Sequence, residues 1–130
     1  MAAQEDAGGG LPAFLGVSFT EFSPGRLRAE MQVKPDLLTP IGNMHGGALA
    51  AVCDHVLGCV CYPHMKRGQW AATTEFKVNY LAPVSQGVAD VEAAIVSLTR
   101  TTAVVRISIE NESRLVCMAQ GTVLIRDPKP

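Results

Sequence analysis

The feature that most constrains the fold of this chain is a long apolar stretch that contains a single charge. Between Asp36 and Lys66 the only Asp, Glu, Lys or Arg is Asp54. Residues 46–62 are mostly small and apolar, without strict alternation, and the stretch is too long for a typical strand. We therefore expect one long helix that is apolar nearly all round and lies buried in the core.

A two-residue period of apolar and polar side chains precedes and follows this predicted helix. A turn signal at residues 23–25 lies between two alternating stretches and predicts an early hairpin. Alternation returns at Thr73, with Thr74, Phe76, Val78 and Tyr80 expected on one face, and further strands are expected at about residues 88–98, 102–110 and 115–126. Strands joined by short links pair antiparallel. We therefore predict an α+β domain whose antiparallel sheet wraps around one central helix.

The length of the chain fits one domain. A chain of 130 residues can bury one core but not two. We expect a flexible tail over residues 1–12 and the folded domain over residues 13–127. The first ten residues carry two acids and no Lys or Arg, and no apolar segment follows them, which is not typical of a secretion signal or a transit peptide. We therefore expect a cytoplasmic protein.

Charge and composition argue against several classes of partner and site. The formal charge of -1 offers no basic field for nucleic acid, and residues 48–62, interrupted by Asp54 and His55, are shorter than the roughly 20 residues of a membrane span. Three of the four cysteines lie in the apolar stretch, which favours reduced, buried thiols. No C-x-x-C pair or H-x-x-x-H step occurs. We expect no metal, no cofactor, no nucleic acid and no membrane.

The single carboxylate in the predicted helix needs a reason to be there. Asp is a poor helix former, and burying an unpaired carboxylate is costly. Asp54 either faces solvent or caps a loop at the edge of the helix, or it is a catalytic carboxylate in an apolar cleft that raises its pKa. The residues alone leave both alternatives open.

A glycine pair marks the start of the same helix. Gly46 and Gly47 follow His45, and helix N-termini present free N–H groups that can hold an oxyanion. A tight turn into the helix would explain the glycines equally well. Gly46 precedes Asp54 by eight residues, or about 12 Å along a helix. This distance is too long for both to act on one carbonyl within one chain, so a site that uses both needs two chains.

Two segments of the sequence resemble a known family. IGNMHGGALAAVCDHVLG at residues 41–58 and TTEFKVNYLAPV at residues 73–84 resemble the PaaI-like branch of the hot-dog fold acyl-CoA thioesterases. The resemblance runs from about Phe14 to Arg126. It implies an antiparallel sheet wrapped around one long helix, dimers joined edge to edge, and tetramers formed as dimers of dimers. It also implies acyl-CoA as substrate, with each site built by two chains.

The resemblance implies a role for each residue of the motifs. The Gly46 N–H polarises the thioester carbonyl, and Asp54 of the partner chain acts as nucleophile or as general base for water. Thr73 orients the attacking water or the carboxylate. The substrate-binding loop is expected to contain His45, Gly47, Asn43 and Thr39, with His45 fixing the loop rather than transferring protons.

One departure from the family keeps other functions open. Many relatives carry Asn or Gln where this chain has Thr39, so either Asn43 or a water replaces that contact, or turnover is weaker. The alternatives are a module that binds acyl-CoA without hydrolysis, and a hydratase or dehydratase in which His45 is catalytic. The acyl group, aryl-acetyl or medium-chain, is expected to contact apolar side chains, and no cation is singled out for the CoA phosphates. The expected apolar contacts are Val52, Val56, Leu57, Phe76 and Val78, and the available cations include Lys66, Arg67, Lys77, Arg100 and Arg106.

Overall fold

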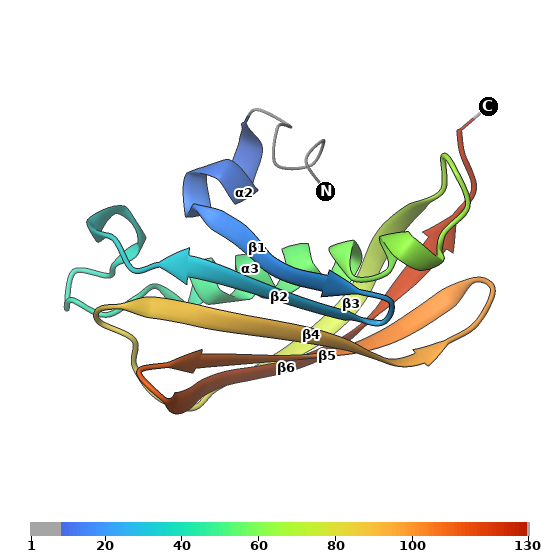
Figure 1. Cartoon of the computed structure of the whole chain (residues 1–130). Helices are drawn as coiled ribbons and strands as arrows, with labels where there is room; N and C mark the ends of the chain where they lie inside the picture. Colours follow the sequence, from blue (N-terminus) through green and yellow to red (C-terminus); the bar gives the residue numbers. More distant parts are fainter. Residues whose placement is uncertain (1–8, 130) are drawn as a thin grey trace.

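A computed structural model describes residues 9–129, which form one six-stranded antiparallel sheet around one long helix (Figure 1). Residues 1–8 of the predicted tail lie outside the described residues. The elements in chain order are α2 (Gly10–Leu15), β1 (Val17–Ser23), β2 (Arg26–Gln32), η1 (Pro35–Leu37), α3 (Gly46–Cys59), η2 (Tyr62–His64), β3 (Trp70–Tyr80), β4 (Val88–Leu98), β5 (Thr102–Asn111) and β6 (Arg114–Arg126).

The sheet has the strand order β1-β2-β4-β5-β6-β3, and every neighbouring pair is antiparallel. Figure 1 shows that the sheet curves around α3. The predicted α+β architecture is therefore confirmed. β3 lies at one edge of the sheet, so one side of its backbone has no partner strand among the described residues.

The core lies between α3 and the concave face of the sheet. Val52, Val56 and Leu57 of the helix are fully buried there. In β2, buried and exposed residues alternate strictly, with Leu27 and Met31 facing the core, as the two-residue period predicts. The helix is apolar nearly all round because strands and α2 cover most of its surface.

The apolar stretch corrects one expectation. By length and composition alone, the 19 residues Gly46–His64 are long and apolar enough to cross a membrane. In the fold, 44% of that window is buried, and α3 packs on five of the strands and on α2. The same composition therefore serves here as the core helix of a wrapped sheet.

Two element boundaries differ from the sequence prediction, and one short helix was not predicted. α3 ends at Cys59, and the chain then forms the single 3-10 turn of η2, because Pro63 cannot continue the helix. β3 begins at Trp70, three residues earlier than predicted, because these residues pair with the end of β6. The short helix α2, which was not predicted, begins within the predicted tail and buries Leu15 in the core.

A bulge in β3 decides which side chains of this strand face the helix. The register with β6 shifts between Thr73 and Glu75, so Thr74 is the extra residue, and its hydroxyl donates to the Thr122 carbonyl. Thr73 and Tyr80 are seven residues apart and would face opposite sides of a regular strand. The bulge brings both to the helix side, and it corrects the prediction that Thr74 shares a face with Tyr80.

Gly121 of β6 pairs with Phe76, next to the bulge, at a point where the two strands approach closely. A Cβ on Gly121 would lie 2.4 Å from the Phe76 Cβ and 2.6 Å from the Glu75 carbonyl oxygen. Neither atom belongs to a flexible side-chain end, so the backbone itself would have to shift. The bulged geometry of β3 therefore depends on a glycine at this position.

We predict that Gly121→Ala lowers the free energy of unfolding by about 1–3 kcal/mol, since the added methyl overpacks the β3–β6 contact. The matched control is Gly58→Ala in α3, where the nearest atom to the new Cβ is the Ala71 Cβ at 3.8 Å. There the helix propensity of Ala should raise the stability by up to about 1 kcal/mol. Urea unfolding followed by circular dichroism measures both. Equal stabilities of the two variants would contradict the close approach at Gly121.

Candidate active site

The carboxylate of Asp54 is held by a threonine at the open edge of the sheet. Thr73 Oγ1 donates a hydrogen bond of 2.7 Å to Asp54 Oδ1, and no described residue donates to Oδ2. Asp54 is exposed in the single chain and lies beside a cavity of about 330 Å³. In the isolated chain, Asp54 therefore faces solvent at the edge of the helix, which is one of the two alternatives that the sequence left open. The cavity is lined by Asp54, His55, Gly58, Cys59, Tyr62, Ala71 and Thr73.

His55 lies next to Asp54 but is held by packing. Its ring stacks on Phe19, with centroids 5.7 Å apart and an interplanar angle of 9°. Burial lowers the pKa of His55 below its ordinary value, and the negative charge of Asp54 opposes this shift only in part. A largely neutral imidazole therefore forms one wall of the carboxylate cavity.

The N-terminus of the same helix presents a free backbone donor. Gly46 is the first residue of α3, and within residues 9–129 no group accepts a hydrogen bond from its N–H. His45 is the N-cap: its Nδ1 accepts the Gly47 N–H at 2.8 Å. Tyr80 donates its hydroxyl to the Gly46 carbonyl at 2.8 Å. The peptide between Gly46 and Gly47 is thus held at both its C=O and its N–H, while the Gly46 N–H stays available.

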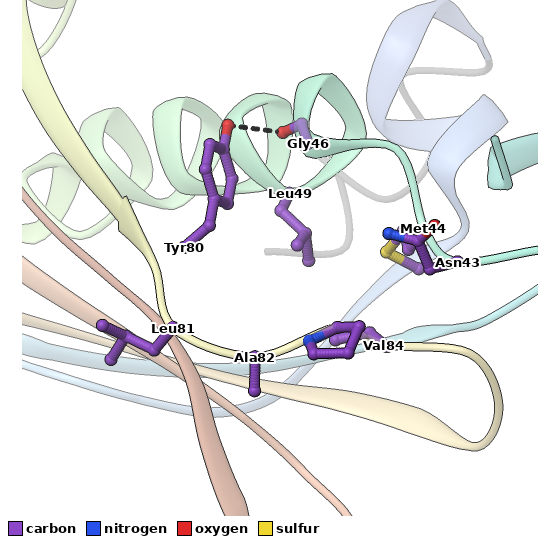
Figure 2. Close-up of a pocket in the computed structure, with 9 residues that line it drawn as sticks. Asn43, Met44, Gly46, Leu49, Tyr80, Leu81, Ala82 and Val84 are labelled. Atoms are coloured by element: carbon purple, nitrogen blue, oxygen red, sulfur yellow. Dashed lines mark hydrogen bonds between the residues drawn. The ribbon is translucent and has the colours of Figure 1, made fainter. Parts of the chain in front are cut away.

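Gly46 lines a cavity of about 420 Å³ (Figure 2). Figure 2 shows Tyr80 rising from the end of β3 toward the first turn of α3, with Asn43 and Met44 on the loop before the helix. A Cβ on Gly46 would lie 3.1 Å from the Tyr80 Cζ, so the glycine leaves room for this ring. The lining residues are Asn43, Met44, Gly46, Leu49, Tyr80, Leu81, Ala82, Pro83 and Val84.

Tyr80 is the site residue that the sequence analysis missed. It continues the alternation of Phe76 and Val78 toward the helix, and that periodicity, combined with the start of the helix, is the signal that points to it. Burial raises the pKa of Tyr80 above its ordinary value, so its hydroxyl remains a donor at neutral pH.

In the loop before the helix, two hydrogen bonds join Thr39 to Asn43. Thr39 Oγ1 donates to Asn43 Oδ1 at 2.9 Å, and the Thr39 N–H donates to the Asn43 carbonyl at 2.7 Å. Asn43 lines the cavity beside Gly46 and Thr39 does not. The side-chain N–H groups of Asn43 are not used by any described residue. The loop therefore places an amide donor, oriented by Thr39, next to the Gly46 cavity.

The predicted site residues fall into two groups within one chain. Gly46 and Asn43 belong to one cavity, whereas Asp54 and Thr73 belong to the other, and the two cavities share no lining residue. His45 and Gly47 lie at the helix start and are exposed. A single chain therefore carries two separate groups of candidate residues, which we call half-sites, one at each end of the segment of β3 between Thr73 and Tyr80.

The structure corrects the expected acyl contacts. Val52, Val56 and Leu57 have no exposed surface, because they face the sheet inside the core. Phe76 and Val78 are half-buried and pack against the same core. None of these five residues lines either half-site cavity.

The four cysteines are buried, as expected, and Cys53, Cys61 and Cys117 carry free thiols. Burial raises the pKa of Cys61 to about 11. A hydrogen bond with Cys117, together with burial, raises the pKa of Cys53. These two thiols stay protonated at neutral pH, so neither is suited to act as a nucleophile. In the part of the chain that the structure describes, no three His, Cys, Asp or Glu residues come close enough to hold a metal ion.

Comparisons with known proteins agree on one family. Residues 41–118 match the model of the thioesterase superfamily. A proofreading thioesterase, EntH, of Klebsiella pneumoniae is 35% identical over 75 residues, which cover 58% of this chain and 55% of that protein. The E. coli PaaI protein of the phenylacetic acid degradation operon has the same fold, with a TM-score of 0.87, 21% identity, and coverage of 98% of this chain and 91% of that chain. The protein smu.793 of Streptococcus mutans, solved bound to acetyl CoA, has a TM-score of 0.79 and 25% identity, over 88% and 91% of the two chains.

Proposed function

The chain belongs to the thioesterase superfamily and has its hot-dog fold, and on this premise we propose that it hydrolyses an acyl-CoA to a free carboxylic acid and coenzyme A. One observation carries the proposal. A free N–H at Gly46, the first residue of the helix, and a hydrogen-bonded carboxylate at Asp54, eight residues further along the same helix, both adjoin the edge strand β3.

The register of β3 supports a site shared between two copies of the chain. Two copies of β3 can pair antiparallel about a two-fold axis, with Thr73 of one copy opposite Tyr80 of the other. In this pairing Thr74, the extra residue of the bulge, has no residue opposite it. Glu75 is then opposite Asn79, and the two-fold axis passes through Lys77 and its own copy. This symmetric pairing brings the carboxylate half-site of each chain to the Gly46 half-site of the other, and it completes the hydrogen bonds of the free edge.

The chemistry follows from the two half-sites. The Gly46 N–H of one chain donates to the thioester carbonyl oxygen and stabilises the oxyanion that forms as the carbonyl is attacked. Asp54 of the other chain uses Oδ2 to take a proton from water, while the water oxygen bonds to the carbonyl carbon. The C–S bond then breaks, and the sulfur leaves with its electron pair and takes up the proton. In the nucleophilic variant, Oδ2 itself bonds to the carbon, and the C–S bond breaks to release the CoA thiolate. Water then hydrolyses the resulting anhydride, which frees the acid and regenerates Asp54, and the proton released from this water goes to the thiolate.

Contacts in the loop and at the helix cap favour hydrolysis over the two alternative functions. In the hydratase alternative His45 has to act as acid or base, yet its Nδ1 is engaged by the Gly47 N–H, which favours a role as helix cap. In the binding-module alternative, Thr39 leaves the site without a polar contact to the substrate. Asn43, held by Thr39 beside Gly46, supplies an amide donor instead and so favours turnover.

We also propose where the enzyme is located and how it assembles. We expect a cytoplasmic homodimer, with a dimer of dimers as the larger assembly. The cavity at Gly46 is largely apolar and has room for an aryl-acetyl or a medium-chain group.

We predict that Asp54→Asn lowers kcat by about 10²- to 10⁴-fold, because the amide can neither take a proton nor attack the carbon. KM should change little, and the fold should survive, since Asp54 is exposed and Thr73 can still donate to the amide oxygen. Thiol release from a panel of aryl-acetyl and medium-chain acyl-CoAs measures the effect. Asp90→Asn is the matched control, an exposed carboxylate on β4 outside both half-sites. Full activity of Asp54→Asn would refute the role of the carboxylate.

We predict that Gly46→Pro loses about 10²- to 10³-fold in kcat relative to Gly46→Ala. Both substitutions add the Cβ that presses on Tyr80, but only proline removes the N–H. Proline is favoured at the first position of a helix, and the φ of -62° and ψ of 133° at His45 suit a residue before proline. Steady-state kinetics and melting temperatures of both variants provide the test. If Gly46→Pro were as active as Gly46→Ala, the oxyanion would have to be held elsewhere.

A further inference from the structure

The hydroxyl of Tyr80 forms a hydrogen bond that the helix itself does not require. It donates to the Gly46 carbonyl at 2.8 Å, as the dashed line in Figure 2 marks. At the start of an α-helix the N–H groups of the first turn lack partners, whereas the carbonyls accept N–H groups from the next turn. A side chain that caps this end therefore accepts a hydrogen bond, as His45 Nδ1 does from the Gly47 N–H. Tyr80 donates instead, so its bond does not serve as a cap.

The residues at the helix start need restraint from outside the helix. Gly46 and Gly47 are the first two residues of α3. Glycine has more backbone freedom than any other residue, and ordering it costs the most conformational entropy. An oxyanion donor is effective only when its N–H is oriented before the reaction begins. A donor built on two consecutive glycines therefore depends on neighbouring groups for its orientation.

Hydrogen bonds hold the backbone on both sides of the Gly46 N–H. On the N-terminal side, the Met44 N–H donates to the Val84 carbonyl at 2.6 Å, and the His45 N–H donates to the Leu37 carbonyl at 2.8 Å. On the C-terminal side, the Tyr80 hydroxyl holds the Gly46 carbonyl. The free N–H thus lies between two points at which other segments fix the chain.

The sheet gives Tyr80 a fixed position from which to act. Its backbone pairs with Cys117 of β6, and the next residue, Leu81, donates its N–H to the Val116 carbonyl at 2.8 Å. The ring also limits the space beside the helix start, because a Cβ on Gly46 would lie 3.1 Å from the Tyr80 Cζ. Tyr80 therefore restrains Gly46 both by a hydrogen bond and by contact.

We infer that Tyr80 is a positioning residue for the hydrolysis, an inference that rests on the proposed function. Its hydroxyl and ring fix the first turn of α3 so that the Gly46 N–H points at the thioester oxygen. Tyr80 acts through Gly46 and not on the substrate, because its single O–H is already directed at the Gly46 carbonyl. The effect is one of orientation, since this carbonyl shares its peptide with the Gly47 N–H and not with the Gly46 N–H.

The proposed pairing of two chains adds a second neighbour to the same side chain. Tyr80 is then opposite Thr73 of the second copy, and both face the helix side of the sheet. Directly opposite residues of an antiparallel pair have Cβ atoms about 5 Å apart. Tyr80 would therefore adjoin the Gly46 half-site of its own chain and the carboxylate half-site of the other. A ring fixed in this place keeps the two half-sites in one arrangement.

The first test removes only the hydroxyl. Tyr80→Phe keeps the ring and should lower kcat by about tenfold with a change in KM of less than about twofold, because tenfold corresponds to the net contribution of one hydrogen bond. Thr99→Val is the matched control, since its hydroxyl accepts the Thr102 N–H at 3.0 Å in the turn between β4 and β5, outside both half-sites. The control should leave kcat and KM unchanged. A raised KM with an unchanged kcat in Tyr80→Phe would show that Tyr80 is only a wall of the cavity and would overturn the inference.

The second test separates the hydrogen bond from the volume of the hydroxyl. Tyr80 is replaced by para-aminophenylalanine or by para-methylphenylalanine, which both fill the place of the hydroxyl, although only the amino group can donate to the Gly46 carbonyl. The amino variant should restore kcat to within about threefold of the wild type, and the methyl variant should remain as slow as Tyr80→Phe. Equal recovery by both would show that volume alone matters. Recovery by neither would show that the hydroxyl transfers a proton or accepts a hydrogen bond, and either result would contradict the positioning role.

The third test needs no substrate. Backbone NMR relaxation of the isotope-labelled protein reports the motion of the Gly46 N–H on the picosecond to nanosecond timescale. Tyr80→Phe should lower the order parameter of this amide from about 0.85, the value of a rigid backbone, toward about 0.6. Thr99→Val should leave it unchanged.

The three readouts separate this inference from the proposed function. Loss of order at Gly46 in Tyr80→Phe, in a protein that hydrolyses no thioester, would support the positioning of Gly46 by Tyr80 and refute the hydrolysis. An active enzyme in which Tyr80→Phe leaves either kcat or the order of Gly46 unchanged would refute the positioning role alone.

Discussion

The fold depends on burying one helix whose surface is apolar on nearly all sides. Val52, Val56 and Leu57 of α3 are buried against a sheet that curves around the helix. The cover is incomplete along the edge strand β3, where Asp54 of the helix is exposed and bonded to Thr73. The polar residues of the candidate site lie along this uncovered margin of the helix. The same constraint that builds the core therefore also decides where a site can be.

β3 fixes the spacing of the candidate site residues that contact it. Its bulge at Thr74 turns both Thr73 and Tyr80 toward the helix, so that one contacts Asp54 and the other contacts Gly46. The carboxylate and the oxyanion donor thus both adjoin one strand. A symmetric pairing of two such strands would arrange both around one thioester.

The sequence predicts the architecture well because the architecture follows from two local patterns of apolar residues. The alternation in β2 and the long apolar helix are local signals, and both reappear in the fold. The pairing of residues 70–72 with β6, the bulge at Thr74 and the contact of Tyr80 with Gly46 depend on partners far away in the chain. Local patterns do not report such partners, so the start of β3 and the role of Tyr80 were missed. The bond of Thr39 to Asn43 shows the same limit, since the motif alone left its replacement open.

We propose that each site takes Asp54 from one chain and Gly46 from another. The most direct measurement is the thioesterase activity of a heterodimer of Asp54→Asn and Gly46→Pro chains, isolated through two different affinity tags. One of its two sites would hold both intact residues and the other neither, so the account predicts about half the activity of the wild-type dimer, although each parent is nearly inactive. A pure heterodimer no more active than its parents would mean that the site lies within one chain.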